Sequence, residues 1–388
     1  MDENRRAFLD EPGYEPQSKV GFKLSQFIKS FIITMLSLIL IVVGTGGFFV
    51  LRIAGGIPSA PEIPSVTAPP AVQRPNPNIP EDEQEYPDDN DDFTQEWVPR
   101  APEGFTDENR KEDFFTFLIV GLNEGTNANT VMVASIDINN NEINIISIPR
   151  DSMLNVSRPN PARKLSSSYM VGAAAGRGRA GGVANIQREV MGIIGFMPDF
   201  YIIIDYDAFF AIIDVVGGVE IYVPFHMRYD DPFQDLHIDI QPGLQLMDSK
   251  TALHFARFRR ANANFTSITD YQRIANQQTV IDAVLAKVLT PRTLIRINEF
   301  IRVFDESVYS NLDRNAMAWF AQNHFSPFTS RGVINFYTTP MIGSSREPYW
   351  YEILNPGGIV ELVNRTINPF NMPILRSHLD IITEVPER

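Results

Sequence analysis

From residue 114 onward, short apolar runs rich in β-branched and aromatic residues alternate with segments whose apolar positions recur at helical spacing. The runs predict strands over Phe114–Leu122, Thr130–Asp137, Glu142–Ile148, Tyr201–Asp205, Val219–Val223 and Gly332–Thr338. The periodic segments predict helices over Val183–Ile194, Ala208–Val216, Ile274–Leu289, Leu294–Phe304 and Arg314–Phe325. Asn139–Asn141 predicts a tight turn that joins two of the strands as a hairpin. This alternation is typical of an α/β fold, and we expect an α-β-α sandwich around a mixed central sheet.

The N-terminal part contains a longer apolar run, from Phe31 to Leu51, without a charged residue. Its length is that of a helix that crosses a bilayer, so we expect a transmembrane helix over residues 31–52. A cleaved signal peptide and a buried core helix are the alternatives, but a signal peptide has a shorter apolar region. Lys19, Lys23 and Lys29 precede the run and only Arg52 follows closely. This bias predicts a single-pass protein of the cell membrane, with residues 1–30 as a cytoplasmic tail and the main domain outside the cell.

Residues 53–112 have the composition of a linker. Prolines recur from Pro58 to Pro102, and residues 81–92 contain eight acidic residues and no basic one. Such a segment lacks the apolar side chains that ordering requires, so we expect a disordered, solvated spacer rather than a cation-binding site. A folded domain over residues 113–375 and a C-terminal tail over residues 376–388 complete the expected organisation.

The amino-acid composition excludes several classes of function. The chain has 388 residues, 44% of them hydrophobic, which is enough for a substantial core. Its formal net charge of −14 argues against nucleic acid as a partner. Cysteine is absent, and the five histidines are scattered, so neither thiol chemistry nor a histidine metal site is expected.

Arginines follow several of the predicted elements. The strand that ends at Ile148 is followed by Pro149, Arg150 and Asp151. Arginine at such a strand end is suited to hold a phosphate, although a surface Arg–Asp pair is the plainer interpretation. Farther along, Arg257 and Arg259 would share one face of an extended segment, and Arg273 and Gln277 one face of a helix. These arginines could converge on one anionic group or could remain solvated at the surface.

Five motifs in this order and spacing resemble the LytR–CpsA–Psr family over roughly residues 114–290. They are SIPRD at Ser147–Asp151, Lys164-Leu165 before Tyr169, DYDAFFAIIDVVGGVEIYVP at Asp205–Pro224, GLQLMDSKTALHFARFRR at Gly243–Arg260 and DYQRIANQQ at Asp270–Gln278. A membrane anchor followed by an external domain is also similar to the family. The glycine-rich stretch Gly172–Gly182 lacks the lysine and Ser/Thr of a P-loop, and we expect a mobile loop there.

The resemblance implies an extracytoplasmic phosphotransferase. Such enzymes move an anionic glycopolymer from a polyprenyl-pyrophosphate carrier in the membrane to peptidoglycan. By motif match, Arg150, Arg257, Arg259 and Arg273 would bind the pyrophosphate with help from Gln277. Arg150 and Asp151 would be the catalytic pair, with Asp151 either orienting an arginine or acting as a base. The polyprenyl chain would lie in an apolar channel between sheet and helices.

The chain departs from the family at the metal site. The family has two aspartates that hold magnesium (Mg²⁺) where this chain has Asn123 and Asn129. Asparagine offers magnesium a carbonyl oxygen but no charge, so we expect a weakened site, with Glu124 nearby as a partial substitute. A family arginine is also replaced, by Asn276. The alternative function is therefore a catalytically weak member that binds lipid-linked intermediates or scaffolds envelope assembly.

Overall fold

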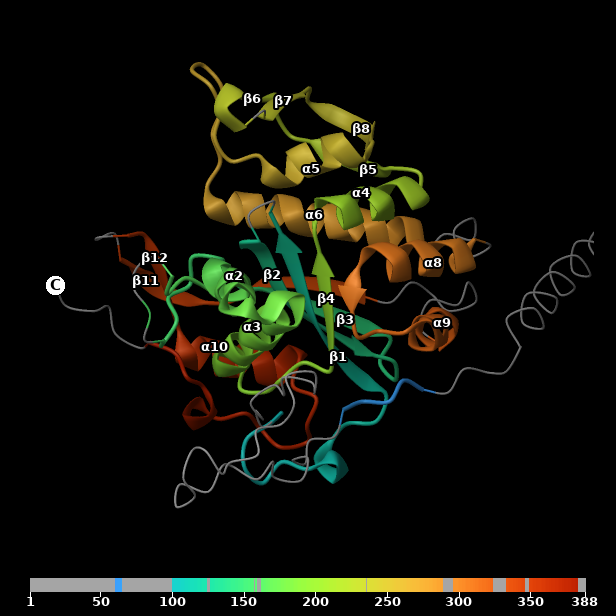
Figure 1. The fold of residues 1–388 in the computed structure, drawn as a ribbon, viewed down its shortest axis with the longest axis vertical. Coiled ribbons are helices and arrows are strands. Elements are labelled where there is room, and N and C mark those ends of the chain that lie inside the picture. The colour runs from blue at the N-terminus through green and yellow to red at the C-terminus, as the bar shows by residue number, and fades with distance from the viewer. Residues whose placement is uncertain are drawn as a thin grey trace, which may run out of the picture. The chain divides into compact units, whose positions relative to one another are not determined.

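The computed structural model describes residues 60–64, 100–123, 126–156, 158, 162–234, 236–288, 296–323, 333–345 and 349–382. At its centre is a six-stranded mixed sheet with the strand order β10-β3-β2-β1-β4-β9 (Figure 1). Its strands are β1 (Phe114–Leu122), β2 (Ala128–Asp137), β3 (Glu142–Ser147), β4 (Phe200–Ile204), β9 (Tyr309–Ser310) and β10 (Val333–Thr338). The predicted hairpin is confirmed, because β2 and β3 pair antiparallel, with Asp137 opposite Glu142 across the turn.

The strand directions bring the carboxyl ends of several strands to one edge of the sheet. Since β2 runs antiparallel to both β1 and β3, these two run the same way. Strand β4 is parallel to β1, and β10 is parallel to β3. The carboxyl ends of β1, β3, β4 and β10 therefore meet at one edge of the sheet, which is where ligands bind in open α/β folds.

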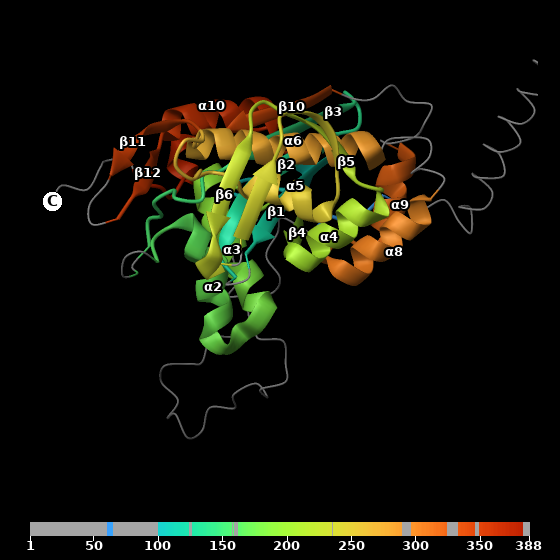
Figure 2. The same ribbon diagram turned by 90° about the horizontal axis from the view of Figure 1, so that it is seen from above.

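Helices cover both faces of the sheet. The helices are α2 (Ser168–Gly172), α3 (Gly178–Ile194), α4 (Tyr206–Val215), α5 (Ser249–Arg257), α6 (Asp270–Val288), α8 (Ile297–Ser307), α9 (Arg314–Asn323) and α10 (Pro356–Thr366). Strand β1 shows why two layers are needed: Leu118 and Val120 pack with α3 and α10, while Phe115 and Phe117 pack with α9. Figure 2 shows α2 and α3 on one side of the strands and α8 and α9 on the other. The expected α-β-α arrangement around a mixed sheet is thus observed.

A further layer, which the sequence did not predict, lies on the outer side of α4, α5 and α6. It consists of two separate strand pairs, β5 (Val219–Val223) with β8 (Gly243–Met247) and β6 (Met227–Asp231) with β7 (Leu236–Ile240). In β5 and β7 buried and exposed residues alternate strictly. Their buried side chains form a core with residues of α5 and α6 that is distinct from the cores beside the central sheet.

The folded unit begins earlier and ends later than expected. Ala101 and Phe105 are buried in the main core, so residues 100–112 belong to the fold rather than to a linker. The buried carboxylate of Asp199, just before β4, binds both Arg100 and Arg110, at 3.2 and 2.8 Å. At the other end, Ile381 is also buried, which places residues 376–382 in the fold rather than in a tail. Residues 100–112 were assigned to the linker because the segment before residue 103 is rich in prolines and acidic residues.

The glycine-rich stretch Gly172–Gly182 is helical, contrary to the expected loop. It completes α2, passes through a π-helical turn and enters α3. A Cβ at Gly182 would lie 2.9 Å from the Tyr169 ring, and one at Gly172 would lie 2.2 Å from the carbonyl oxygen of Gly181. These glycines therefore permit the close packing of α2 on α3, which composition alone does not distinguish from a loop.

The predicted transmembrane helix over residues 31–52 lies outside the described residues, as does most of the predicted linker. Within the ranges given above, no helix combines the length and the apolarity that crossing a membrane requires.

Candidate functional site

A cavity of about 460 Å³ lies at the carboxyl edge of the sheet. It is lined by Asn123, Asn129, Arg150, Tyr206, Tyr229, Leu236, Ile238, Arg257, Arg259, Arg260, Arg273 and Gln277. We call it the arginine pocket. It brings together the four arginines, the glutamine and the two asparagines that the sequence proposed, from segments up to 154 positions apart in the chain (277 − 123). Asp151 is not among the lining residues.

Arg150 follows the carboxyl end of β3, which positions its side chain. Pro149 stops the strand, and the Arg150 side chain turns toward the start of β2, where its Nη1 donates to Asn129 Oδ1 at 2.8 Å. Asp151 accepts from Lys164 Nζ at 2.8 Å, and its other oxygen lies 3.9 Å from Arg150 Nε. Because Asp151 is paired with Lys164 and lies beside the pocket, the geometry suits orientation of Arg150 better than proton abstraction.

The second group of arginines follows α5. Arg257 is the last residue of this helix, so it is not in the extended backbone that the sequence suggested. Phe258 then adopts extended angles and is fully buried in the outer core. This buried ring lies between Arg257 and Arg259 in the chain, and both arginines line the pocket. The Arg257 guanidinium also lies over the Tyr206 ring, 5.1 Å from its centroid, a cation–π contact.

Arg273 and Gln277 lie one turn apart on α6 and both line the pocket, as their spacing predicted. Arg273 is only 6% exposed and binds Asp270 at 2.8 Å. Burial, together with the charge of nearby Arg150, lowers the pKa of Arg273 to about 10 despite Asp270, so the side chain is still charged at neutral pH. The neighbouring Gln278 donates to Ser147 Oγ at 2.9 Å and to the Tyr337 carbonyl, which fastens α6 to the ends of β3 and β10.

The pocket has more donors than the described chain satisfies. Within the described residues, the buried Nε atoms of Arg150 and Arg273 have no hydrogen-bond acceptor. Five arginines line the cavity, and the carboxylates close to them, Asp151 and Asp270, lie at its margin. An anion with several oxygens could accept further hydrogen bonds from the guanidinium groups that line the cavity.

The residues at the expected metal site fit magnesium poorly. Asn129 Oδ1 already accepts from Arg150, and Asn123 Oδ1 accepts from the backbone N–H of Asn127 at 2.9 Å. The described lining residues include no carboxylate, and no group of three acidic or histidine side chains that could hold a metal occurs among the described residues. Glu124 lies outside the described residues. We therefore derive no chemical step through a metal ion.

Three lining residues come from the outer layer and were not anticipated. Tyr229 is on β6, and Leu236 and Ile238 are on β7, so this hairpin supplies an apolar wall opposite the arginines. No motif predicted them, because their only sequence signal is the alternation of apolar and polar residues in a short hairpin. The polyprenyl chain was expected in an apolar channel between sheet and helices. On α3, the apolar residues Ile186, Val190, Ile193 and Ile194 are fully buried in the main core. That surface covers the sheet, and the position of a lipid tail stays a prediction.

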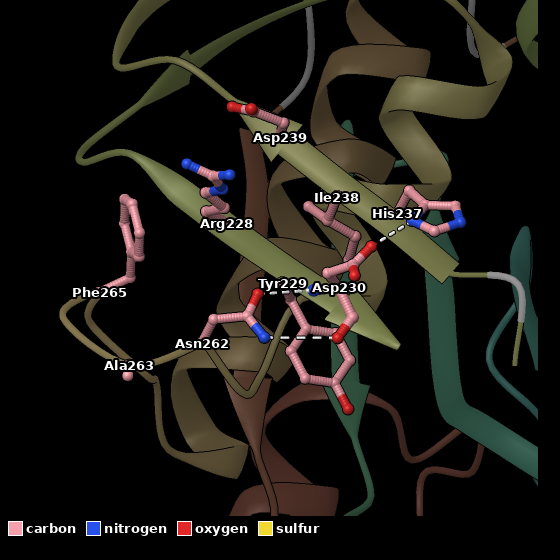
Figure 3. A pocket seen from close by; sticks show the side chains of 9 residues that line it. All are labelled: Arg228, Tyr229, Asp230, His237, Ile238, Asp239, Asn262, Ala263 and Phe265. Carbon is pink, nitrogen blue, oxygen red and sulfur yellow. Dashed lines mark hydrogen bonds and ion pairs between the residues drawn. The ribbon is translucent and has the colours of Figure 1, made fainter. Parts of the chain in front are cut away.

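A wider hollow of about 660 Å³ lies beside β6 and β7 (Figure 3). It is lined by Arg228, Tyr229, Asp230, His237, Ile238, Asp239, Asn262, Ala263 and Phe265. Its charged groups have other partners: Asp230 pairs with His237, Asp239 pairs with His226, and the Arg228 guanidinium lies over the Phe265 ring. Its lining contains one arginine and two aspartates, whereas five arginines line the arginine pocket, so we place the candidate site in the latter.

The chain resembles known proteins over most of this unit. The LytR_cpsA_psr family profile matches residues 84–362, about 72% of the chain (279 of 388 residues). A relative from Bacillus subtilis strain 168, the polyisoprenyl-teichoic acid–peptidoglycan teichoic acid transferase TagV, is 23% identical over 230 residues. That match covers 58% of this chain and 56% of TagV, so the chain spans little more than half the length of this relative.

Solved structures share the fold. The crystal structure of B. subtilis TagV aligns with a TM-score of 0.53 at 20% identity and covers 70% of this chain and 100% of TagV. A structure of TagT bound to LI-WTA aligns with a TM-score of 0.51 at 17% identity, over 67% of this chain and 92% of that one.

Proposed function

Because this chain belongs to the LytR–CpsA–Psr family, we propose that it transfers an anionic glycopolymer from a polyprenyl-pyrophosphate carrier to peptidoglycan. The relatives' names support this proposal, since they describe transfer of teichoic acid from a polyisoprenyl carrier to peptidoglycan. We further propose that the domain works outside the cell membrane, as the apolar run at residues 31–52 and the lysines before it suggest.

The observation that carries the proposal is the convergence of five arginines from three separate chain segments on one cavity, whose described lining contains no carboxylate. A pyrophosphate offers several anionic oxygens, each of which can accept from a guanidinium group. Phosphoryl transfer depends mainly on positioning and on neutralising negative charge, which fixed arginines in a partly buried pocket provide. The neighbouring wall of Leu236 and Ile238 suits the start of an apolar carrier.

The proposed reaction forms one P–O bond and breaks another. A hydroxyl oxygen of the acceptor sugar bonds to the phosphorus that carries the glycopolymer. The bond from this phosphorus to the bridging oxygen breaks, and its electron pair leaves with polyprenyl monophosphate. The hydroxyl proton passes to the leaving phosphate or to water. Arg150, Arg257, Arg259 and Arg273 hold the pyrophosphate oxygens, Gln277 donates a neutral hydrogen bond, and Asp151 positions Arg150.

Replacement of Arg150 tests the proposal. Each charge-assisted contact contributes roughly 1.5–3 kcal/mol, so Arg150→Ala should weaken binding of a polyprenyl pyrophosphate by about tenfold or more. Transfer of a lipid-linked glycopolymer to peptidoglycan fragments should fall at least as far. Arg150→Lys should restore charge but not the forked geometry, and should recover only part of the loss.

Arg302→Ala is the matched control, because Arg302 is an exposed arginine on α8 that pairs with Glu306 and does not line the pocket. It removes the same charge from the chain and should leave carrier binding unchanged. Equal carrier affinity in the Arg150→Ala and Arg302→Ala proteins would contradict the assignment of the site.

A second function has an observation in its favour. The two asparagines replace the family's magnesium aspartates and are already engaged as acceptors, which favours a protein that holds lipid-linked intermediates without efficient transfer. Such a protein would bind the carrier through the same arginines and show no transfer to peptidoglycan fragments across a magnesium titration.

A further inference from the structure

Beside the arginine pocket lies a group of exposed aromatic side chains with a carboxylate among them. Tyr271, in the first turn of α6, is 49% exposed, and Trp350, just before β12 (Tyr351–Leu354), is 41% exposed. The Tyr271 hydroxyl reaches Met341 on β11 (Met341–Ser345) at 3.4 Å, and Trp350 Nε1 donates to Glu352 Oε1 at 2.9 Å. We call Tyr271, Trp350 and Glu352 the aromatic platform. Figures 1 and 2 both show β11 and β12 beside the same end of α6.

The platform is joined directly to the residues that form the pocket. The Glu352 N–H donates to the Asp151 carbonyl at 2.9 Å, and the Glu352 carbonyl accepts from Met153 N. Strand β12 therefore pairs with the segment that follows Arg150. On the other side, Tyr271 follows Asp270, whose carboxylate binds Arg273. The platform and the pocket thus share the two chain segments that hold Arg150 and Arg273.

The carboxylate of Glu352 is suited to a neutral partner with hydroxyl groups. Within the described residues, the indole of Trp350 is the side-chain donor to Oε1, and Oε2 has no hydrogen-bond partner. Partial burial raises the pKa of Glu352, and the nearby carboxylates of Asp151 and Asp270 raise it further against the bond from Trp350. These acidic neighbours disfavour a second anion on the platform, whereas a sugar hydroxyl can donate to Oε2 without adding charge.

We infer that the aromatic platform binds the acceptor: a sugar ring of a glycan strand stacks on Trp350 and Tyr271 and donates a hydroxyl hydrogen bond to Glu352. Sugar rings present an apolar C–H face and a polar hydroxyl rim, which match an aromatic surface with a carboxylate at its edge. The anionic donor would occupy the arginine pocket and the uncharged ring the acidic, aromatic surface next to it. This inference rests on the proposed function, which requires an acceptor close to the pyrophosphate.

The test uses the full-length protein in lipid nanodiscs and a neutral soluble probe, a disaccharide of two β-1,4-linked N-acetylglucosamine units. Calorimetry gives the dissociation constant of the probe, and transfer assays give the KM for donor and acceptor separately. Trp350→Ala and Glu352→Ala should each raise the dissociation constant and the acceptor KM by about tenfold. The donor KM should stay unchanged, and Trp350→Phe should restore most of the affinity.

Tyr222→Ala is the matched control, because Tyr222 on β5 is 66% exposed and belongs to the outer layer. Melting temperatures of all variants separate loss of binding from loss of folding, and the Trp350→Phe protein keeps the test valid if Trp350→Ala fails to fold. Unchanged probe affinity and acceptor KM in the platform variants would overturn the inference.

The two proposals fail in different ways. If the wild type transfers the glycopolymer and Trp350→Ala leaves the acceptor KM unchanged, the platform inference is overturned and the proposed function stays intact. Binding of the probe that depends on Trp350, with no transfer by the wild type, overturns the proposed function and leaves the platform in place. A change of oligomeric state in the Trp350→Ala protein with unaltered probe affinity would make the surface a contact between copies and would also overturn the inference.

Discussion

Two single residues set the expected dependence on magnesium. Asn123 and Asn129 supply oxygen atoms without charge, and one of them is already bound to Arg150. The double change Asn123→Asp with Asn129→Asp adds two charges at the pocket. Magnesium prefers carboxylates, and a charge pair a few ångströms apart contributes about 4 kcal/mol at an effective dielectric constant of ~20. We expect magnesium affinity to rise at least about tenfold for each carboxylate, with little change in carrier binding.

Calorimetric magnesium titration of the apo-protein measures this directly, and transfer rates across the same titration show whether catalysis follows. Asn139→Asp adds one such charge in the exposed turn between β2 and β3, at the opposite edge of the sheet, and serves as the control. Should the double variant bind magnesium no better than the Asn139→Asp protein, the two asparagines are not the reason for the poor fit.

At this scale, the sequence predicts charged residues better than apolar ones. Arg150, Arg257, Arg259, Arg273 and Gln277 were predicted by motif match and by their positions near predicted elements, both of which are local signals, and all of them line the pocket. The apolar wall was not predicted, because Leu236 and Ile238 reach the pocket only through the folding of a hairpin that the sequence did not indicate. Asp151 was predicted as part of the catalytic pair, which stays a prediction; in the structure it is not a lining residue, and it binds Lys164.

At the scale of elements, the carboxylate of Asp199 joins three segments. It lies just before β4 and is fully buried, and it accepts from Arg100, Arg110 and both the N–H and hydroxyl groups of Thr116 on β1. Asp199→Asn keeps the shape and removes the charge. Two buried guanidinium groups are then left without their anion, so the free energy of unfolding should fall by roughly 3–5 kcal/mol.

Urea unfolding followed by circular dichroism measures the loss. Asp305→Asn removes an exposed carboxylate that binds Arg314 at 2.6 Å, and should cost less than about 1 kcal/mol. Similar losses in the two proteins would mean that the Asp199 cluster is no stronger than a surface ion pair.

Elements with a strong apolar signal were located well, and those with a weak one were not. Strands β1 and β5 occupy the predicted ranges, whereas α6 begins at Asp270, one turn before the predicted start, because its first turn carries polar residues. The strands β6, β7, β8, β11 and β12 were not predicted. Each has only four or five residues, so its pattern is too short to separate from a loop.

At the scale of the whole molecule, the predicted membrane topology determines where the domain works. The run at residues 31–52 and the lysines before it predict one membrane crossing with the domain outside. Protease added to intact protoplasts should therefore remove the domain, while the tail at residues 1–30 remains protected. Protection of the domain would contradict this topology.

The absence of native cysteine gives an independent measurement. A membrane-impermeant thiol reagent should label intact cells that carry Leu375→Cys, since Leu375 is half exposed on the domain. It should not label cells that carry Asp10→Cys unless the membrane is first permeabilised. The reverse labelling pattern would place the domain inside.

The grip of Asp199 on Arg100 and Arg110 also has a mechanical consequence. Tension applied through the segment before residue 100 enters the fold at the amino end of β4, which lies between β1 and β9 inside the sheet. The arginine pocket lies at the opposite edge of the sheet. A force that acts between these two edges runs along the strands, so it loads all the hydrogen bonds between neighbouring strands in shear at the same time. Hydrogen bonds loaded together resist force better than bonds opened one after another from an end. On the proposed topology, with the chain anchored before residue 100 and the polymer in the arginine pocket, these strands would carry the pull between the anchor and the polymer.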